Sequence, residues 1–321
     1  MIVFKFPFNE NIFTLTEEHT EDSVKFVSFD GTGNTVFKGK IEEITAEKLL
    51  QNELFSDSCN GTVNEFSEQN QDGYEKKLKE VIAFIKRENL RKLVISRRKK
   101  VDYNEGKISL SGTFLNLCNS YPNAFVYFFQ KDKTWMGAFS ELLGKFDKKT
   151  GEFQTMSLAG TLPIEERWTE KEIEEQKPVS DYISAILTRY SHDVEVSETY
   201  DHHSGNIKHL RNDFRAKIKP TQLEELIAEL HPTPAVCGIP KEKCRNVIRD
   251  FENYDRELYA GYIRIETGSE VQYFVNLRCA QFFRKYALLY VGGGITALSS
   301  PEKEWQETEL KAQAIRKNIT V

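Results

Sequence analysis

Apolar residues at helical spacing give the sharpest local signal in the chain. Four of them fall three or four positions apart: Leu78, Val81, Ile82 and Ile85. This spacing predicts an amphipathic helix over residues 74–89. Further helices are expected at 113–120, 169–190, 221–229, 241–253 and 302–317. Pro178 is expected to interrupt the second of these, because a proline inside a helix removes a hydrogen-bond donor.

Short runs of β-branched and aromatic residues predict strands along most of the chain. They lie at 24–29, 35–40, 92–96, 124–129, 134–139, 152–158, 194–200, 207–218, 258–266, 271–282 and 286–291. The last three follow one another with short connections, which favours antiparallel pairing. Antiparallel strands mixed with separate helices indicate an α+β fold.

A polar stretch, residues 51–72, is expected to be a loop because Asn, Ser and Glu dominate it. It separates a variable N-terminal portion, residues 1–73, from a core of residues 74–321. We expect the N-terminal portion to pack on the same domain as the core.

Composition limits the classes of protein that fit. Of 321 residues, 39% are hydrophobic and 29% are charged, which is typical of a globular protein. The net charge of −5 argues against a nucleic-acid-binding protein, which usually has a basic face. The one basic run, residues 97–100, is expected to be a solvated strand end.

The cysteines and the absence of long apolar runs bear on location. Five cysteines are scattered with no CxxC pair, so neither a zinc site nor a disulfide framework is indicated. No stretch approaches the roughly 18 apolar residues of a membrane span. We therefore expect a cytoplasmic protein with no membrane or nucleic-acid partner, either a monomer or a homodimer.

Two groups of glutamates lie at helical spacing. Glu304, Glu307 and Lys311 share one face of the predicted C-terminal helix, and Glu172 and Glu175 share a face of another. Carboxylates so arranged can hold Mg²⁺, which prefers oxygen ligands and keeps some of its waters. Solvated faces with Glu–Lys pairs are the alternative that the spacing leaves open.

Other segments combine unusual residues with apolar surroundings. Gly292–Gly294 follow an apolar strand and allow close backbone approach to a ligand, or form a plain turn. Lys92 adjoins Leu, Val and Ile, and Glu141 precedes two leucines. Burial would make the lysine a candidate base and the glutamate a candidate acid, whereas a strand-end lysine and a turn carboxylate are the alternatives. His209 and His231 stay ambiguous, and no Ser–His–Asp or Cys–His arrangement is recognisable.

Taken together, ten segments resemble the chorismate-utilising enzymes, which include isochorismate, salicylate, anthranilate and aminodeoxychorismate synthases. The segments run in family order: KLVISR (92–97), WMGAFSELL (135–143), SLAGT (157–161), the glutamate helix (169–179), IKHL (207–210), LHPTPAVCGIPK (230–241), YDRELYAGYI (254–263), LRCAQF (277–282), YVGGGI (290–295) and SSPEKEWQETELKA (299–312). The resemblance implies a large α/β sandwich of two antiparallel sheets flanked by helices, with residues 74–321 as the chorismate-binding catalytic core.

The resemblance also implies roles for individual residues. Lys92 corresponds to the base that activates water, and Glu141 to the acid that assists departure of the ring hydroxyl. The magnesium ligands would be Glu175 and Glu307, with Glu304 as a water-mediated partner. The remaining residues correspond to substrate-binding positions: Thr161, His209, Ala235, Val236, Tyr259, Arg278, Gly292, Gly293, Gly294 and Lys311.

The lysine at position 92 separates branches of the family, because members that use ammonia typically lack it. The resemblance therefore favours isochorismate synthase, a magnesium-dependent isomerase that serves menaquinone or siderophore synthesis, over salicylate synthase and the ammonia-using enzymes. Three departures stand out: Gln176 replaces a usual histidine, Ser140 replaces a usual proline, and residues 210–218 diverge. The first two are expected to affect the surroundings of Glu175 and Glu141.

Overall fold

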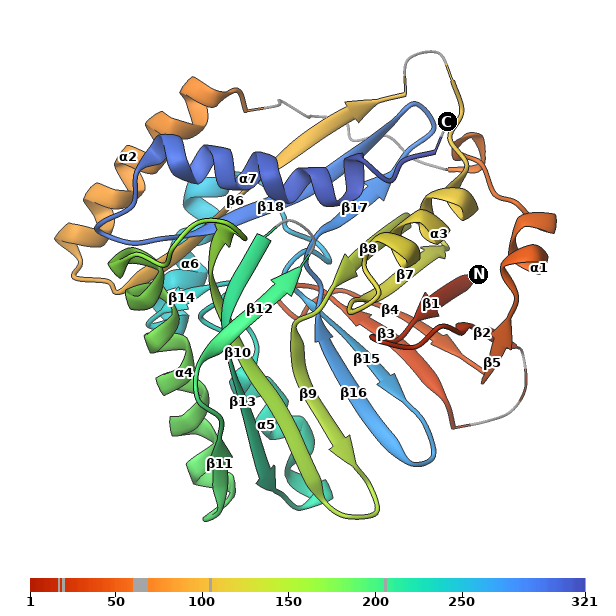
Figure 1. Ribbon diagram of the computed structural model, residues 1–321, viewed down its shortest axis with the longest axis horizontal. Helices are drawn as coiled ribbons and strands as arrows, with labels where there is room; N and C mark the ends of the chain where they lie inside the picture. The colour runs from red at the N-terminus through yellow and green to blue at the C-terminus, as the bar shows by residue number, and fades with distance from the viewer. Residues whose placement is uncertain (17, 19–20, 60–68, 104–105, 205–206, 321) are drawn as a thin grey trace.

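The computed structural model describes residues 1–16, 18, 21–59, 69–103, 106–204 and 207–320. Its core consists of two large sheets stacked face to face, with helices on the outer sides (Figure 1). Every strand pairing within the described ranges is antiparallel. The predicted α+β fold of two antiparallel sheets flanked by helices is confirmed.

The first sheet has nine described strands. In spatial order they are β14 (Gly238–Ile239), β6 (Lys92–Asp102), β18 (Tyr286–Ile295), β17 (Cys279–Phe282), β8 (Thr134–Phe139), β7 (Phe125–Gln130), β1 (Ile2–Lys5), β2 (Ile12–Thr16) and β5 (Lys40–Ile44).

The second sheet also has nine described strands. Eight form a continuous order: β11 (Val194–Val196), β13 (Ile207–Lys217), β10 (Glu152–Pro163), β9 (Leu142–Asp147), β16 (Glu270–Val275), β15 (Tyr262–Glu266), β3 (Ser23–Val27) and β4 (Asn34–Lys38). The ninth, β12 (Tyr200–Ser204), pairs with β13.

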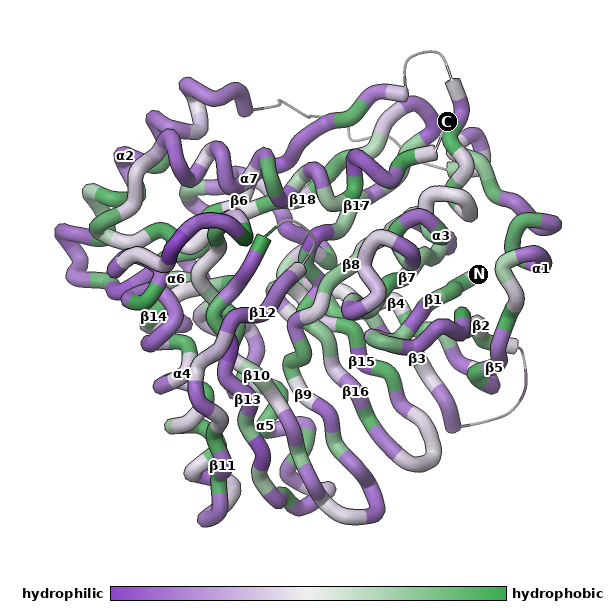
Figure 2. The backbone as a smooth tube through the Cα atoms, viewed as in Figure 1, coloured by the Kyte–Doolittle hydropathy of each residue, from purple (hydrophilic) through white to green (hydrophobic). Residues whose placement is uncertain are grey.

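Aromatic side chains fill the space between the sheets. The ring of Phe125 on β7 stacks on Phe274 of β16 with centroids 4.6 Å apart, and Phe26 on β3 lies 4.6 Å from Phe129 on β7. Burying each ring contributes roughly 1.5–3 kcal/mol, so these contacts bind one sheet to the other. Buried positions alternate with more exposed ones from residue 210 to 217 of β13, as expected for a sheet with one face in the core, although hydrophilic residues predominate along this strand (Figure 2).

Helices cover the outer faces. The structure has α1 (Ala46–Gln51), α2 (Gln71–Arg87), α3 (Leu110–Ser120), α4 (Glu170–Tyr190), α5 (Leu223–Leu230), α6 (Lys241–Glu252) and α7 (Pro301–Arg316), with short 3₁₀ turns at Ser56–Ser58 and Pro220–Gln222. Helices α4 and α5 pack on the second sheet, whereas α3 and α7 pack on the first (Figure 1). Among the described residues, no helix has both the length and the apolar character needed to cross a membrane.

The helix boundaries differ from those predicted by up to three residues, and one predicted interruption is absent. Helix α2 begins at Gln71 instead of residue 74, because the Asn70 side chain caps it by accepting from the Gly73 amide. Helix α4 runs through Pro178 without the predicted interruption. A proline inside a helix costs about 3 kcal/mol. The neighbouring Val179 and Ile183 are buried in the core, so tertiary packing holds the helix together.

The basic run 97–100 is not a solvated strand end, because β6 continues through it to Asp102. Arg97 is buried, and its guanidinium carbon lies 3.8 Å from the centre of the Trp305 ring. Arg97 and Lys99 both pair with Glu309 of α7. Helix α7 therefore supplies the partners that the sequence alone did not reveal.

The predicted strand 271–282 is two strands, one in each sheet. The chain leaves β16 after Val275 and enters β17 at Cys279, with Arg278 at a φ of 43° between them. Buried Asn276 fixes this crossing: its side-chain nitrogen donates to the Leu258 carbonyl, and its oxygen accepts from the Tyr127 hydroxyl. The predicted strand 194–200 likewise divides into β11 and β12.

The N-terminal portion contributes to both sheets. Strand β1 pairs with β7 in the first sheet, and β3 pairs with β15 in the second. The predicted loop 51–72 includes the end of α1, a 3₁₀ turn and the start of α2, and its residues 60–68 lie outside the described residues. That the N-terminal portion is variable stays a prediction.

Candidate active site

One pocket opens where β6, β18, β10, α4 and α7 meet. It gathers residues that are far apart in the sequence and that the sequence had singled out: Lys92, Glu141, Thr161, Glu175, His209, Ala235, Val236, Tyr259, Arg278, Gly292, Gly293, Gly294 and Lys311. The predicted metal ligands Glu304 and Glu307 lie on α7 beside this pocket, each within 3.4 Å of the position that a Cβ would take on Gly293. His231 does not line it, and its Nε2 lies 3.4 Å from the Phe29 carbonyl.

The three glycines lie inside strand β18 and do not form a turn. A Cβ on Gly294 would lie 2.3 Å from Oε1 of Glu175 and 2.4 Å from Cε of Lys92. Their absent side chains therefore make room for the charged groups above the strand. The pairing with β17 stops at Tyr290, so beyond it the edge of β18 opposite β6 borders the pocket. Lys311 donates to the Gly292 carbonyl at this edge.

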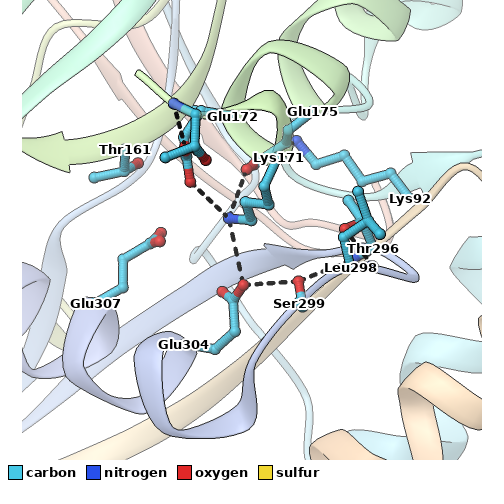
Figure 3. A network of polar contacts seen from close by, with 12 residues as sticks. Lys92, Thr161, Lys171, Glu172, Glu175, Thr296, Leu298, Ser299, Glu304 and Glu307 are labelled. Carbon is cyan, nitrogen blue, oxygen red and sulfur yellow. Dashed lines mark hydrogen bonds and ion pairs between the residues drawn. The ribbon is translucent and has the colours of Figure 1, made fainter. Parts of the chain in front are cut away.

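Two helices bring the glutamates together. Helix α4 begins with a capping box between Thr169 and Glu172, which places Glu175 one turn further along, over β18. Helix α7 begins at Pro301, and its first turn carries Glu304. The buried Glu175 and Glu304 thus approach from different helices, as Figure 3 shows.

Lys171 lies between these two carboxylates, and two further lysines contact the glutamates of the cluster (Figure 3). Nζ of Lys171 lies 3.0 Å from Glu175 Oε2 and 3.3 Å from Glu304 Oε1. Nζ of Lys92 lies 3.0 Å from Glu175 Oε1, and Lys311 lies 2.6 Å from Glu307. In the described part of the chain, no three His, Cys, Asp or Glu side chains already converge as a ligand set.

The electrostatics of this cluster fit a cation. Burial raises the pKa of Glu304 to about 7, with Glu307 and Glu175 adding to the rise and Lys171 opposing it. Burial alone would also raise the pKa of Glu175, but Lys171 and Lys92 hold it below its usual range. Oε2 of Glu304 is buried without a hydrogen-bond partner among the described residues. A carboxylate set with an unused buried oxygen suits a hard divalent ion such as Mg²⁺.

Glu141 is a second buried carboxyl group that lines the pocket. It follows β8 and is only 4% exposed. Burial raises its pKa to about 7, against the opposing effects of Lys92, Lys311 and Arg278. A carboxyl group with such a pKa can carry a proton at neutral pH and act as a general acid.

Arg278 is held in place by two neighbours. It donates to Ser204 Oγ, and its NH2 lies 2.8 Å from Nε2 of His209. Because Nδ1 of His209 donates to the Gly160 carbonyl at 2.9 Å, Nε2 is the acceptor and the ring is neutral. Burial and the nearby Arg278 and Lys311 keep the histidine pKa well below its ordinary value. The Thr161 hydroxyl lies 3.2 Å from the same Nδ1.

The remaining wall is fixed by a buried arginine that the sequence reasoning did not single out. Arg256 donates to the carbonyls of Val236 and Val94, and it pairs with buried Glu252. It thereby ties the segment with Ala235 and Val236 to strand β6. Arg256 lies in the segment YDRELYAGYI, and its membership of that recognised segment could have drawn attention to it. Lys171 and Ser204 were also missed, although Lys171 lies in the quoted glutamate helix.

Of the two departures expected to affect the site, Gln176 lies differently from expectation and Ser140 lies as expected. Nε2 of Gln176 donates to Asn212 Oδ1 at 2.6 Å and to Ser157 at 3.2 Å, so its amide faces β13 and β10 and not the Glu175 cluster. Ser140 does precede Glu141 and lines the pocket, and its hydroxyl lies 3.0 Å from Nε2 of His202.

Known proteins resemble this chain in sequence. Isochorismate synthase 2 of Arabidopsis thaliana is 38% identical over 115 residues, which cover 35% of this chain and 20% of that protein. Isochorismate synthase DhbC of Bacillus subtilis is 31% identical over 155 residues, covering 47% of this chain and 39% of that protein. The matched segments thus span less than two thirds of these relatives.

Known structures share the fold. A putative 2,3-dihydroxybenzoate-specific isochorismate synthase, DhbC of Bacillus anthracis, superposes with a TM-score of 0.79 at 24% identity, over 99% of this chain and 95% of the other. Component I of anthranilate synthase from Streptococcus pneumoniae gives 0.69 at 17% identity, over 98% and 89%. The family described as chorismate binding enzyme matches residues 15–320. The chain therefore belongs to the chorismate binding enzymes.

Proposed function

We propose that this protein is a magnesium-dependent isochorismate synthase that converts chorismate to isochorismate. The observation that carries the proposal is the pairing in one pocket of a buried lysine, Lys92, with a buried carboxyl group, Glu141, whose pKa is raised to about 7. One group is suited to take a proton and the other to give one. The sequence matches to isochorismate synthases support the same reaction.

Substrate binding follows from the charges around the pocket. Chorismate carries two carboxylates, and Arg278 and Lys311 present cationic groups to the cavity. Ser204 and His209 orient the arginine, while Glu307 and the Gly292 carbonyl orient the lysine. The open edge of β18 and the wall formed by Ala235 and Val236 would hold the ring between them.

Glu175, Glu304 and Glu307 would hold the magnesium ion. When bound, the ion supplies positive charge that anchors a substrate carboxylate and stabilises charge developing during the displacement. The lysine at position 92 takes a proton from water as its oxygen adds at C2 of the ring. Glu141 delivers a proton to the hydroxyl that leaves C4. One water is consumed at C2 and one is released from C4, so substrate and product are isomers. Lys92 enters the step as a neutral amine and leaves it protonated, while Glu141 leaves it ionised, so one proton returns from Lys92 to Glu141 between turnovers.

Incubation with chorismate and Mg²⁺, followed by chromatographic separation of the products, tests the proposal. Isochorismate that forms with Mg²⁺ and not with EDTA is the expected result. Salicylate as the product would instead identify a salicylate synthase. Turnover only with added ammonia or glutamine would identify an amine-using relative and overturn the role given to Lys92.

We further propose that the enzyme works in the cytoplasm, as a monomer or homodimer.

A further inference from the structure

Lys171 occupies the centre of the acidic cluster, where no role in the proposed reaction requires a lysine (Figure 3). Its Nζ contacts Glu175 and Glu304 and lies 3.9 Å from Oε1 of Glu172. Its side chain is only 17% exposed. The ammonium group of Lys171 therefore occupies a position among carboxylates that would otherwise suit a divalent ion.

The helix itself does not favour a lysine at this position. Lys171 is the second residue of α4, and the positive end of a helix dipole disfavours cations in the first turn. Burial would also lower its pKa, but Glu175, Glu307 and Glu304 raise it instead. The carboxylates of the cluster therefore hold this ammonium group in place.

The charges of the cluster show what Lys171 contributes. Four carboxylates face three ammonium groups: Glu172, Glu175, Glu304 and Glu307 against Lys92, Lys171 and Lys311. Without Lys171, Glu304 loses its only cationic partner among the described residues, while one of its oxygens is already unpaired. Removing this cation leaves the buried carboxyl group of Glu304 without its ion-pair partner, which is expected to destabilise the free protein.

We propose that Lys171 is a displaceable counter-ion that fills the metal position in the free protein and moves aside when Mg²⁺ binds. This rests on the proposed function, which supplies the metal. The long, partly exposed side chain starts in the first turn of α4, so it can rotate toward solvent without moving the helix. Displacing it breaks its ion pairs with Glu175, Glu304 and, at 3.9 Å, Glu172, and Lys171 therefore weakens metal binding while it stabilises the free protein.

Titration calorimetry of Mg²⁺ into the protein without chorismate tests this, together with melting curves in EDTA. Lys171→Gln is expected to bind Mg²⁺ about tenfold more tightly than the wild type, since its side chain leaves no charge to displace. In EDTA the same variant is expected to melt lower by about 2 °C or more. Lys171→Arg keeps a cation and should retain both wild-type properties.

Lys177→Gln is the matched control, because it removes the same charge from an exposed position on the same helix. It should change neither the Mg²⁺ affinity nor the melting temperature. Equal or weaker Mg²⁺ binding by Lys171→Gln, with normal binding by the wild type, would overturn the role of Lys171 alone. If the wild type and the three variants all failed to bind Mg²⁺ at millimolar concentrations, both the role of Lys171 and the proposed magnesium requirement would be overturned.

Discussion

Nζ of Lys92 lies 3.0 Å from Oε1 of Glu175, and both side chains are buried at the junction of β6 and α4. The residue proposed as the base is thus an ion-pair partner of a residue proposed as a metal ligand. A metal on Glu175 would therefore lie next to the ammonium-bearing side chain of Lys92. The contact places the proposed base and the proposed metal ligand side by side, so a substitution at one position is expected to affect the other.

Substitution of Lys92 separates its charge from its basicity. Lys92→Arg keeps a cation beside Glu175 that cannot act as a base at neutral pH, so we expect Mg²⁺ binding to persist and turnover to disappear. Lys92→Gln should also abolish turnover, and it should destabilise the protein by about 1–3 kcal/mol because Glu175 loses one buried partner. Calorimetry measures Mg²⁺ binding, product chromatography measures turnover, and urea unfolding measures stability. Near-normal turnover by either variant would show that another group is the base.

Glu141 gives the reaction and the stability a pH dependence. The proposed acid must be protonated, so turnover should fall as the pH rises above about 7, tenfold for each further pH unit. Because its folded pKa lies above its ordinary value of 4.5, the folded protein holds a proton that the unfolded chain releases. Stability should therefore fall as the pH rises from about 4.5 to about 7, by about 3 kcal/mol from this group.

Glu141→Gln removes this titration and tests both effects. The variant should lose turnover yet be more stable than the wild type at pH 8, and the difference should vanish near pH 4. Glu174→Gln, an exposed substitution on α4, should leave both properties unchanged. Melting curves across this pH range would contradict the assignment if the wild type and Glu141→Gln ran parallel throughout.

The end of β18 that borders the site leaves no room for a side chain at Gly294. Gly294→Ala would place a methyl group 2.3 Å from Glu175 Oε1 and 2.4 Å from Lys92 Cε. We expect turnover to be lost and stability to fall by about 1–3 kcal/mol, since both charged side chains must shift. Gly268→Ala meets nothing within 4 Å and should change stability by less than about 0.5 kcal/mol. Equal behaviour of the two variants in turnover assays would show that β18 is not crowded in solution.

The sequence predicted most helices and strands because their periodicity is local. Leu78, Val81 and Ile85 form one buried face of α2, as their spacing indicated. The crossing at Asn276 was missed because apolar residues on both sides read as one continuous strand. Only the hydrogen bonds of Asn276 to Tyr127 and Leu258, which are far away in the sequence, reveal it. Arg97 was placed in solvent for the same reason, because Trp305 and Glu309 belong to a distant helix.

The site was predictable to the extent that short motifs carried it. Glu175 and Glu307 belong to segments recognised by resemblance, and the structure places Glu175 in the pocket and Glu307 beside it. Lys171 lies in the same segment as Glu175 but was not singled out, since a lysine between glutamates on a helix is usually part of a surface ion pair. Its burial depends on the approach of α7, which places Glu304 3.3 Å away.

His209 should affect substrate binding by positioning Arg278. His209→Leu removes the acceptor that holds the guanidinium, and we expect the chorismate KM to rise about tenfold with a smaller change in kcat. His209→Gln can still offer an acceptor and should recover part of the affinity. Because burial keeps the ring neutral, no limb near pH 6.5 is expected in the pH profile of the wild type. A fall in kcat without a rise in KM would place the histidine in the chemical step instead.

Gln176 is adjacent to Glu175 but points elsewhere, since successive residues on a helix diverge by about 100°. Its amide joins a buried network with Asn212 and Ser157 that binds α4 to the second sheet. Gln176→Leu should therefore destabilise the protein by about 1–2 kcal/mol, because Asn212 loses a buried donor.

The same substitution should leave the Mg²⁺ affinity within about twofold of the wild type, because its contacts are separate from those of the cluster. In Glu175→Gln, by contrast, the main expected effect is on Mg²⁺ affinity, which should be weakened severely. Calorimetry and urea unfolding on both variants separate the two roles. Loss of Mg²⁺ affinity in Gln176→Leu would mean that α4 reorients when the network breaks. The Gln176 amide bonds Ser157 and Asn212, so it does not itself contact the proposed metal ligands.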